Sequence, residues 1–549
     1  MKRLVVLTPL ITGTILALGV LLGARLNYPS QPAAFVVQNE KEQKIRQILN
    51  MIDYEYVDNV DTDSLLDLTI KDMLHRLDPH SSYIAKEDVA RTEENMQGSF
   101  EGIGIEFMIY RDTLTVIRPV PEGPAEKKGV KAGDRIISVD KTPIAGVGVQ
   151  QLELVDLLKG PGNTTVEVKI FRPVDGSERT VTITRGSIPI NSVEASFMVD
   201  SVTGLIKLNR FSERSAEEVR KAIRELKRAG MQKMILDLRD NPGGLLSASR
   251  KIADEFLGDD VLIVYTKDRA GAKSYTYASS TGQFEEGDLV VLINENSASA
   301  SEIVAGALQD NDRATIVGRR SFGKGLVQEE MVLKDGSRIR LTTSRYYTPT
   351  GRSIQKPFTD GYEAYINESQ ERYERGELIS KDSIKVNEEQ RFLTPGGKVV
   401  YGGGGIMPDV FVPIDTAYRS MGWMYHLFGY TPLDRFAFTF VDDHRREFLK
   451  VSESDFIENF SVSDSLIDRY LIEQEVTNAK DRINTATMNM AKNRLKALMA
   501  KNLFGMGAFY KVIFEEDPMV LRGLRVFHPE EDPDSSSVSD TLKVDNNNP

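Results

Sequence analysis

Apolar residues recur at two different spacings along the chain. Intervals of three and four residues mark two apolar faces near the beginning: Ile45, Ile48, Leu49, Ile52 and Tyr56, then Leu66, Ile70, Met73, Leu74 and Leu77. A helix returns to the same face every 3.6 residues, so this spacing predicts a pair of helices within residues 40–92. The segment 77–83 contains Pro79, which predicts that the helical pair closes there.

Residues 96–186 instead alternate between apolar and polar positions, with glycine-rich turns between the runs. This pattern predicts a β-rich module with one helix over 150–158. The order of its pieces resembles a PDZ domain. Four residues resemble the carboxylate-binding loop of that family: Gly102, Ile103, Gly104 and Ile105. Glycines let backbone N–H groups converge on an anion, and a strand edge accepts an extended peptide, although Gly-x-Gly also occurs in ordinary turns.

Further along the chain, predicted strands alternate with helices between residues 200 and 412. The strands are expected at 204–208, 234–238, 261–265 and 289–293. This succession predicts an α/β layer fold with crossover connections. The densely charged stretch 360–395 is predicted to be a solvated insertion. A second helix-rich region with the only Trp, Trp423, follows, and the acidic tail after His528 is predicted to be disordered.

The first 30 residues carry an export pattern. Lys2 and Arg3 precede an apolar run of 21 residues, 4–24, and Arg25 follows it. A basic start before an apolar run is typical of secretory signals, and the length is also close to the roughly 20 residues that span a bilayer. Signal peptide and membrane anchor both stay open. We expect the rest of the chain to lie on the periplasmic side of the inner membrane if anchored, or to be periplasmic or secreted after cleavage.

Composition removes several classes of chemistry. The chain has 69 Lys and Arg against 81 Asp and Glu, a net charge of -12, which argues against nucleic-acid binding. Cysteine is absent, so disulfides, thiol nucleophiles and thiolate metal sites are excluded. No histidine occurs between residues 81 and 425, so chemistry in that stretch requires another base.

A candidate nucleophile follows the strand predicted at 289–293. Ser297, Ser299 and Ser301 precede an apolar small-residue helix. A serine at a strand-to-helix turn projects its hydroxyl from the end of the sheet, and the first helix amides point toward any oxyanion formed there. Serines also commonly cap helices, so this stretch alone leaves both interpretations open.

Lys324 is the candidate base. Gly318 and Gly323-Lys324 match the first part of a phosphate-binding loop, but Gly325 replaces the Ser or Thr that would hold Mg²⁺, which argues against an NTPase. A free lysine has a pKa near 10.4, and burial in a glycine-lined cleft lowers it enough for the amine to activate a serine. If residues 324–328 form a strand, Gln328 shares a face with Lys324 and its amide oxygen can orient the amine.

These segments together resemble the carboxyl-terminal processing peptidases, or tail-specific proteases. The resemblance covers roughly residues 40–412 and rests on the segments 296–310 and 321–328. Supporting matches occur at 77–83, 236–244, 350–355 and 405–410. It implies a multidomain α+β protein, with a crotonase-like α/β protease core, a preceding PDZ-like domain, and helical N- and C-terminal regions.

The resemblance also implies roles for individual residues. Ser299 is expected as the nucleophile, Lys324 as the base and Gln328 as its orienting partner. The oxyanion hole would use the amide of Ala300 and one glycine of the turn at 241–244. Gly243 is favoured for that role, and Gly244 stays open.

The domains expected on this basis are a signal peptide or anchor at 1–30, a helical region at 35–95, a PDZ-like domain at 96–186, a serine protease core at 187–412, a helical region at 413–525 and a disordered tail at 526–549.

The predicted function is that of a serine endopeptidase that needs no cofactor or metal and processes exported polypeptides with free apolar C-termini. The alternative is a catalytically silent scaffold that binds peptides through its PDZ-like domain, although such a scaffold has no need for Ser299, Lys324 and Gln328 together. The natural substrate, any adaptor and the oligomeric state stay open.

Overall fold

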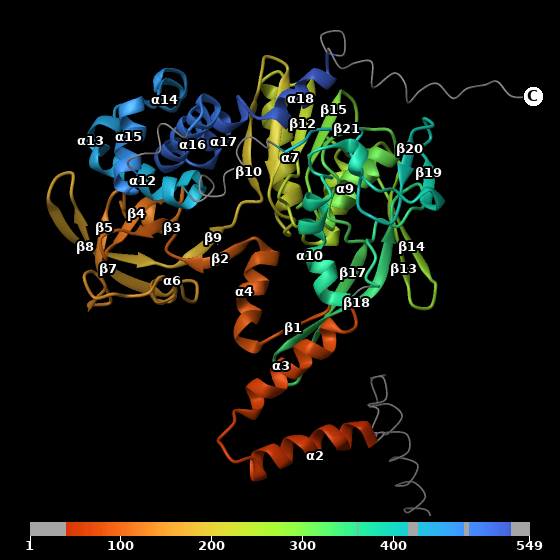
Figure 1. Cartoon of the computed structure of the whole chain (residues 1–549). Coiled ribbons are helices and arrows are strands. Elements are labelled where there is room, and N and C mark those ends of the chain that lie inside the picture. The colour runs from red at the N-terminus through yellow and green to blue at the C-terminus, as the bar shows by residue number, and fades with distance from the viewer. Residues whose placement is uncertain (1–39, 360, 415–426, 477–482, 529–549) are drawn as a thin grey trace, which may run out of the picture. The chain divides into compact units, whose positions relative to one another are not determined.

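The computed structural model describes residues 40–359, 361–414, 427–476 and 483–528 (Figure 1). The apolar run at 4–24, Trp423 and most of the acidic tail lie outside these residues. Among the helices of the described ranges, none is both long and apolar enough to cross a membrane. The chain divides into two compact units, residues 1–72 and 73–549.

The first unit contains the predicted helical pair. Helix α2 spans Glu40–Glu55, and α3 spans Thr62–His75 and continues into the second unit. The apolar residues of α2 remain exposed, with Ile45 and Ile48 at 46% and 48% of their full accessibility. The 3.6-residue spacing therefore predicted the helices correctly, but no residue of α2 is buried.

The β-rich module contains the strands and the helix that the sequence predicted. Its main sheet has the order β3-β4-β5-β7-β8, with the short β6 (Thr142–Pro143) paired to β5. The bounds are β3 Ile105–Ile109, β4 Leu114–Pro119, β5 Arg135–Val139, β7 Thr165–Arg172 and β8 Ser177–Thr184. Helix α6 (Gln151–Leu158) starts one residue after its predicted position, and α5 (Pro124–Lys127) is a single turn. Strand β3 is an edge strand of this sheet.

Two short strands and one helix flank this module. Strand β2 (Ser99–Gly102) pairs with β9 (Gly186–Pro189), and α4 (Lys86–Gln97) precedes β2.

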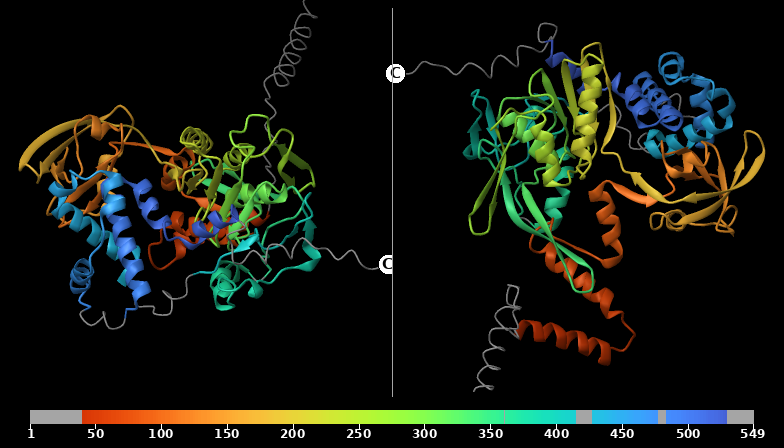
Figure 2. Two further views of the ribbon diagram at one scale, coloured as in Figure 1. Left: turned by 90° about the horizontal axis from the view of Figure 1, so that it is seen from above. Right: turned by 180° about the vertical axis from the view of Figure 1, so that it is seen from behind.

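The second unit is organised around a six-stranded sheet of order β10-β11-β12-β15-β16-β21 (Figures 1 and 2). Its strands are β10 Val193–Met198, β11 Thr203–Leu208, β12 Lys233–Asp237, β15 Leu289–Ile293, β16 Thr315–Gly318 and β21 Val410–Phe411. All pair in parallel except β10, which is an antiparallel edge. Every residue of β11 and β15 is buried, as the unbroken apolar run at 289–293 predicted.

Helices cover both faces of this sheet. The helices α7 (Ser215–Arg228), α8 (Leu246–Asp254) and α9 (Ala300–Asp310) share one large core with it. The opposite core, which includes Leu205, Ile235 and Val290, receives Phe514 from α17 (Met506–Phe514) and Met519 and Val520 from α18 (Pro518–Val526). The last helices of the described chain are thus a layer of the protease core. The sequence indicated a helix-rich region here but not which sheet its helices cover.

The remaining C-terminal helices form a core of their own. They are α12 Tyr430–Asp443, α13 Arg445–Phe448, α14 Glu453–Asn459, α15 Asp464–Glu473 and α16 Thr485–Phe504. Helix α16 contributes the buried Met499 to this core.

A second sheet brings the N-terminal segment 77–83 to the core. Its order is β1-β18-β13-β14, with β17 also paired to β18. The bounds are β1 Ser82–Ile84, β13 Leu262–Asp268, β14 Lys273–Tyr277, β17 Leu326–Val332 and β18 Arg338–Tyr347. Helical spacing over 40–92 did not indicate β1, because a three-residue strand leaves no detectable period.

The prediction of a solvated insertion at 360–395 is wrong for part of that stretch. Helix α10 (Gly361–Glu374) buries Arg372 completely, and Glu377 is only 2% exposed. The Glu377 carboxylate accepts hydrogen bonds from Arg372 at 2.9 Å and from Arg320 at 2.6 Å. Glu377 is thus neutralised by the nearby Arg372 and by Arg320, which lies far away in the sequence, so local charge density was misleading.

Two 3-10 turns, Lys381–Ser383 and Glu388–Gln390, and the ribbon of β19 (Arg391–Leu393) with β20 (Val399–Tyr401) complete this region.

Candidate active site

Ser299 lies at the turn between β15 and α9. Its φ of 55° and ψ of -110° fall in a region that residues with a side chain rarely adopt. Such backbone strain costs about 1–3 kcal/mol and persists where the surroundings enforce it, often at active sites. A serine on a strained strand-to-helix turn is also the arrangement that exposes the nucleophile of many hydrolases.

The two neighbouring serines have structural partners. Ser297 and Ser301 are completely buried. Ser297 Oγ donates to the Leu238 carbonyl at 2.9 Å, and Ser301 Oγ donates to the Asn241 carbonyl at 2.9 Å. Within the described ranges, the half-buried Ser299 hydroxyl donates to no acceptor. The geometry thus separates Ser299 from the other two, which the sequence alone did not.

A buried carboxylate holds Ser299 and Lys324 together. Glu302 Oε2 accepts the backbone N–H of Ser299 at 2.8 Å and that of Lys324 at 2.9 Å. Its Oε1 accepts the Ser321 hydroxyl at 2.5 Å and the Gly323 N–H at 2.6 Å. Burial raises the pKa of Glu302 to about 7, although these hydrogen bonds oppose the shift. Glu302 had no assigned role, and the available signal was the S-x-x-E capping box that it forms with Ser299.

Tyr346 links the same two residues from another side. Its hydroxyl lies 2.7 Å from the Lys324 carbonyl oxygen and 3.2 Å from that of Ser299. The ring is almost completely buried. Glu302 binds the backbone N–H groups of Ser299 and Lys324, and Tyr346 binds their carbonyl oxygens. Together they hold the two backbones against each other.

The Lys324 side chain has the electrostatics expected of a base. Burial, followed by the charge of Arg340, lowers its pKa to about 8, while Glu302 and Asp78 oppose the shift. In the part of the chain that the structure describes, the Lys324 ammonium makes no hydrogen bond to Ser299 Oγ. The structure thus joins the two backbones without joining the two reacting atoms.

Gln328 does not occupy the position that the sequence argument gave it. Strand β17 begins at Leu326, after Lys324, and its register shifts between Val327 and Gln328. The two-residue period that would put residues 324 and 328 on one face is therefore absent. Gln328 Nε2 donates to Thr342 Oγ1 at 3.2 Å, and within the described ranges it has no hydrogen bond to Lys324.

The predicted oxyanion donors lie beside the nucleophile. Ala300 opens α9, and its amide donates to no acceptor among the described residues. A Cβ on Gly243 would lie 2.9 Å from both Ala300 N and Ser299 Cβ, so only glycine fits there. The Gly243 amide, however, donates to Asn241 Oδ1 at 2.9 Å. The Gly244 amide has no acceptor in the described ranges, so both glycines remain candidates.

His80 is a neighbour of the site that the sequence analysis missed. Pairing of β1 with β18 brings its segment to the core, where His80 Nε2 lies 2.8 Å from Tyr365 Oη. Burial, followed by the positive charge of Lys324, lowers the pKa of His80 to about 4. The stretch 81–425 indeed lacks histidine, but a neutral imidazole from outside it lies near Lys324.

The predicted carboxylate-binding loop has free donors. Gly102 ends β2, Gly104 adopts a φ of 75°, and Ile105 begins β3. The amides of Ile103 and Gly104 donate to no acceptor in the described chain, whereas their carbonyls accept from Ala125 and Val120. These two amides are thus available to an anion.

Among the described residues, metal ligands converge neither at the candidate active site nor at the loop 102–105. Within the described ranges, no cluster of three or more His, Asp or Glu side chains is arranged to hold a metal ion.

Comparisons with known proteins agree with this organisation. Family models match as peptidase family S41 over residues 202–363, PDZ domain over 115–172 and activating protease CtpB N-terminal domain over 25–88. A family of unknown function matches residues 423–505.

Curated relatives carry the same assignment. The carboxy-terminal-processing protease of Bartonella bacilliformis is 37% identical over 325 residues, which cover 58% of this chain and 74% of the relative. The carboxy-terminal processing protease CtpB of Bacillus subtilis is 34% identical over 363 residues, which cover 65% and 74%. A solved photosystem II D1 C-terminal processing protease is 30% identical, with a TM-score of 0.33, and the match covers 58% of this chain and 90% of that one. The chain belongs to the carboxy-terminal processing proteases of peptidase family S41.

Proposed function

We propose that this serine peptidase cleaves polypeptides near their C-termini with Ser299 as nucleophile and Lys324 as general base. The observation that carries the assignment is the pair of bridges made by Glu302 and Tyr346. They hold a strained, half-buried serine and a lysine of lowered pKa in one site. A peptide-binding scaffold has no use for that arrangement.

In the proposed first step, the neutral amine of Lys324 takes the proton of the Ser299 hydroxyl as Oγ attacks the scissile carbonyl carbon. The carbonyl oxygen becomes an oxyanion that accepts hydrogen bonds from the Ala300 amide and from one glycine of the turn at 241–244. The lysine then gives its proton to the leaving amine as the C–N bond breaks, which leaves an acyl-enzyme. Lys324 then deprotonates a water molecule, which attacks the ester carbonyl carbon. The ester C–O bond breaks, the proton returns to Ser299 Oγ, and the carboxylic acid product leaves.

The catalytic contacts tighten when substrate binds. Hydrogen bonds between catalytic groups are often long before substrate arrives, so the missing contact between Lys324 and Ser299 is compatible with this role. Gln328 would orient the Lys324 amine after leaving Thr342. Gly243 would donate to the oxyanion after leaving Asn241, or Gly244 would donate in its place.

The PDZ-like module is proposed to recognise the substrate tail. Free amides at Ile103 and Gly104 suit a terminal carboxylate, and the open edge of β3 suits an extended peptide. We propose substrates with free apolar C-termini. The sheet with helices on both faces supports a crotonase-like core, and the run at 4–24 supports a periplasmic location, anchored or after cleavage.

Cleavage of a peptide with an apolar C-terminus tests the proposal. The purified wild type should cleave it, and Ser299→Ala and Lys324→Ala should both lose cleavage while still binding the peptide. Ser279→Ala and Lys334→Ala, which alter the same residue types at exposed positions, should retain it. Cleavage that survives in Ser299→Ala would refute the dyad. Peptide binding without cleavage by the wild type would favour the scaffold alternative.

A further inference from the structure

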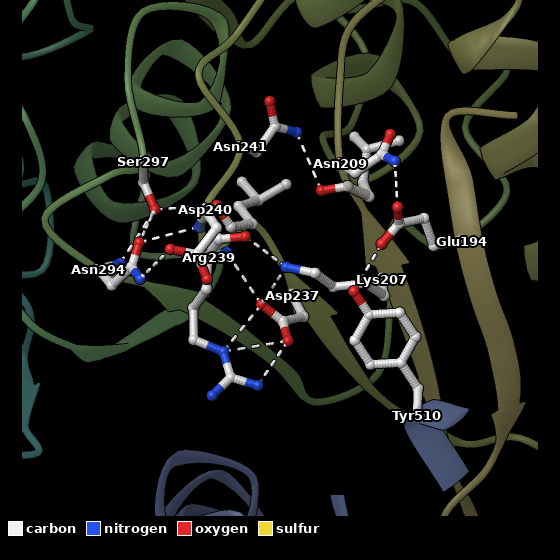
Figure 3. A network of polar contacts seen from close by, with 12 residues as sticks. Glu194, Lys207, Asn209, Asp237, Arg239, Asp240, Asn241, Asn294, Ser297 and Tyr510 are labelled. Atoms are coloured by element: carbon white, nitrogen blue, oxygen red, sulfur yellow. Dashed lines mark hydrogen bonds and ion pairs between the residues drawn. The ribbon is translucent and has the colours of Figure 1, made fainter. Parts of the chain in front are cut away.

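The loop that carries the oxyanion glycines starts from a buried ionic cluster. Asp237, at the end of β12, is completely buried. It accepts a hydrogen bond from Lys207 Nζ at 3.2 Å and from Arg239 Nη2 at 2.6 Å (Figure 3). Lys207 also donates to the Arg239 carbonyl, so the backbone at the start of the loop is held as well as its side chain.

Arg239 has a second carboxylate partner from far along the chain. Its Nη1 donates to both oxygens of Asp517, at 2.9 and 2.8 Å. The side chains of Arg239 and Asp517 are only 12% and 15% exposed. The cluster has two positive and two negative charges on largely buried side chains: Lys207, Arg239, Asp237 and Asp517. A balanced cluster of this kind resists the loss of any one charge.

Asp517 is itself held by its helix. Its Oδ1 accepts the backbone N–H groups of Met519 at 2.9 Å and Val520 at 3.0 Å and so caps α18. That helix packs on the central sheet through Met519 and Val520. Asp517 is therefore a fixed anchor for Arg239 and not a mobile surface group.

The far end of the loop is joined to the nucleophile turn. The carbonyl of Asn241 accepts the Ala298 N–H at 3.0 Å and the Ser301 hydroxyl at 2.9 Å. The Asp240 side chain accepts hydrogen bonds from Asn294 and Asn296, each at 2.8 Å (Figure 3 shows Asp240 and Asn294). Displacement of Arg239 is therefore passed to the residues that frame Ser299.

We propose that Asp517 is a positioning residue for the oxyanion hole: by holding Arg239 it fixes the turn at 241–244 against Ser299. The inference rests on the proposed oxyanion role of that turn. It gives the end of the C-terminal region, which lies outside both the S41 match and the match at 423–505, a part in catalysis. The group acts through Arg239 and does not touch substrate.

Asp517→Asn is the informative variant, because asparagine caps a helix as well as aspartate but removes the charge that binds Arg239. We expect kcat for peptide cleavage to fall by about tenfold while KM stays within about twofold, since the loop is displaced and the peptide site is not. The melting temperature should stay close to that of Lys233→Met, a control that loosens the other end of α18 by removing the contact of Lys233 with the Phe527 carbonyl.

A double-mutant cycle separates positioning from general stability. If Asp517 acts through Arg239, Asp517→Asn should lower kcat in the wild type but have no further effect in Arg239→Gln. Wild-type kcat in Asp517→Asn, additive losses in the double variant, or an equal loss in Lys233→Met would each overturn the proposal. Ser299→Ala in parallel tests the proposed function separately, because cleavage that survives there refutes the dyad whatever Asp517 does.

Discussion

Glu302 and Asp237 are both completely buried carboxylates. Glu302 joins the loops of Ser299 and Lys324, and Asp237 holds the start of the oxyanion loop. Their pKa values are shifted in opposite directions. Burial raises the pKa of Glu302 to about 7, because its partners are neutral N–H and O–H groups. Burial has the same tendency at Asp237, but the charges of Arg239 and Lys207 outweigh it and lower the pKa to about 2.

The difference shows what each loop depends on. The loops of Ser299 and Lys324 meet at a carboxylate whose charge changes near neutral pH. The oxyanion loop starts from Asp237, whose pKa is about 2 because the charges of Arg239 and Lys207 outweigh its burial. One half of the site is therefore sensitive to pH and the other half to the loss of a charged partner.

The largest effect is expected from Asp237→Asn. The substitution leaves Lys207 and Arg239 with excess buried positive charge, which should destabilise the fold by about 3–5 kcal/mol in urea unfolding. Asp134→Asn is the control, because Asp134 is also buried and paired with an arginine, Arg172, but lies in the PDZ-like module. Only Asp237→Asn should also slow phosphonylation of Ser299 Oγ by a small phosphonofluoridate, in which the Oγ–P bond forms as fluoride leaves. Equal phosphonylation rates would mean that Asp237 does not support the oxyanion loop.

Glu302→Gln should have the next largest effect. Glutamine replaces one accepting oxygen with an NH₂ group, which then faces donors, so the fold should lose about 1–3 kcal/mol and kcat should fall about 100-fold. The control is Glu295→Gln, in the segment between β15 and α9, where among the described residues Glu295 pairs with Arg319. If Glu302→Gln retains full kcat, the bridge between the two loops is not required.

Stability should depend on pH through Glu302. Its folded pKa is raised from 4.5 to about 7, so the native state binds more protons than the unfolded state between those values. Glu302 should therefore contribute a free energy of unfolding that falls as pH rises through that window. His80, whose pKa burial lowers from 6.5 to about 4, contributes the opposite slope between those values. The Glu302 contribution is therefore the wild-type slope minus the slope of Glu302→Gln, and this difference should be negative. Asp237, with its lowered pKa, contributes stability that is lost only as pH falls toward about 2. A difference of zero or of the opposite sign would show that Glu302 is not the titrating group.

A smaller shift is expected from Arg340→Gln. The positive charge of Arg340 helps to lower the Lys324 pKa to about 8, so its removal should move the rise of kcat/KM with pH upward by less than about one unit. Arg338→Gln is closely matched, since both arginines pair with Glu330, and it should leave the profile unchanged. Identical shifts in both variants would place the effect at Glu330 and not at Lys324.

Local patterns predicted the parts of the site that are continuous in sequence. The apolar run at 289–293, the turn at Ser299 and the helix after it can be read from neighbouring residues. Lys324 was proposed as the base from its own segment, and Gly243 was placed by resemblance. The structure brings the backbones of both close to that of Ser299.

What the sequence did not reveal depends on contacts between distant polar residues. His80 reaches the site through three residues of β1, and Asp517 reaches Arg239 only because α18 covers the second face of the sheet. The charge pattern predicted that Arg372 and Glu377 lie on the surface, but both are buried and neutralise each other. The shared face expected for Lys324 and Gln328 requires a strand from residue 324, but β17 begins at Leu326. The orienting role of Gln328 stays a prediction.

Activation of Ser299 by the neutral amine of Lys324 can be measured by covalent labelling with an organophosphorus reagent at a series of pH values, with the labelled peptide located by mass spectrometry. We expect label on Ser299, a labelling rate that rises through pH about 8, and no labelling in Lys324→Ala. Label on another serine, or an unchanged rate in Lys324→Ala, would contradict that activation.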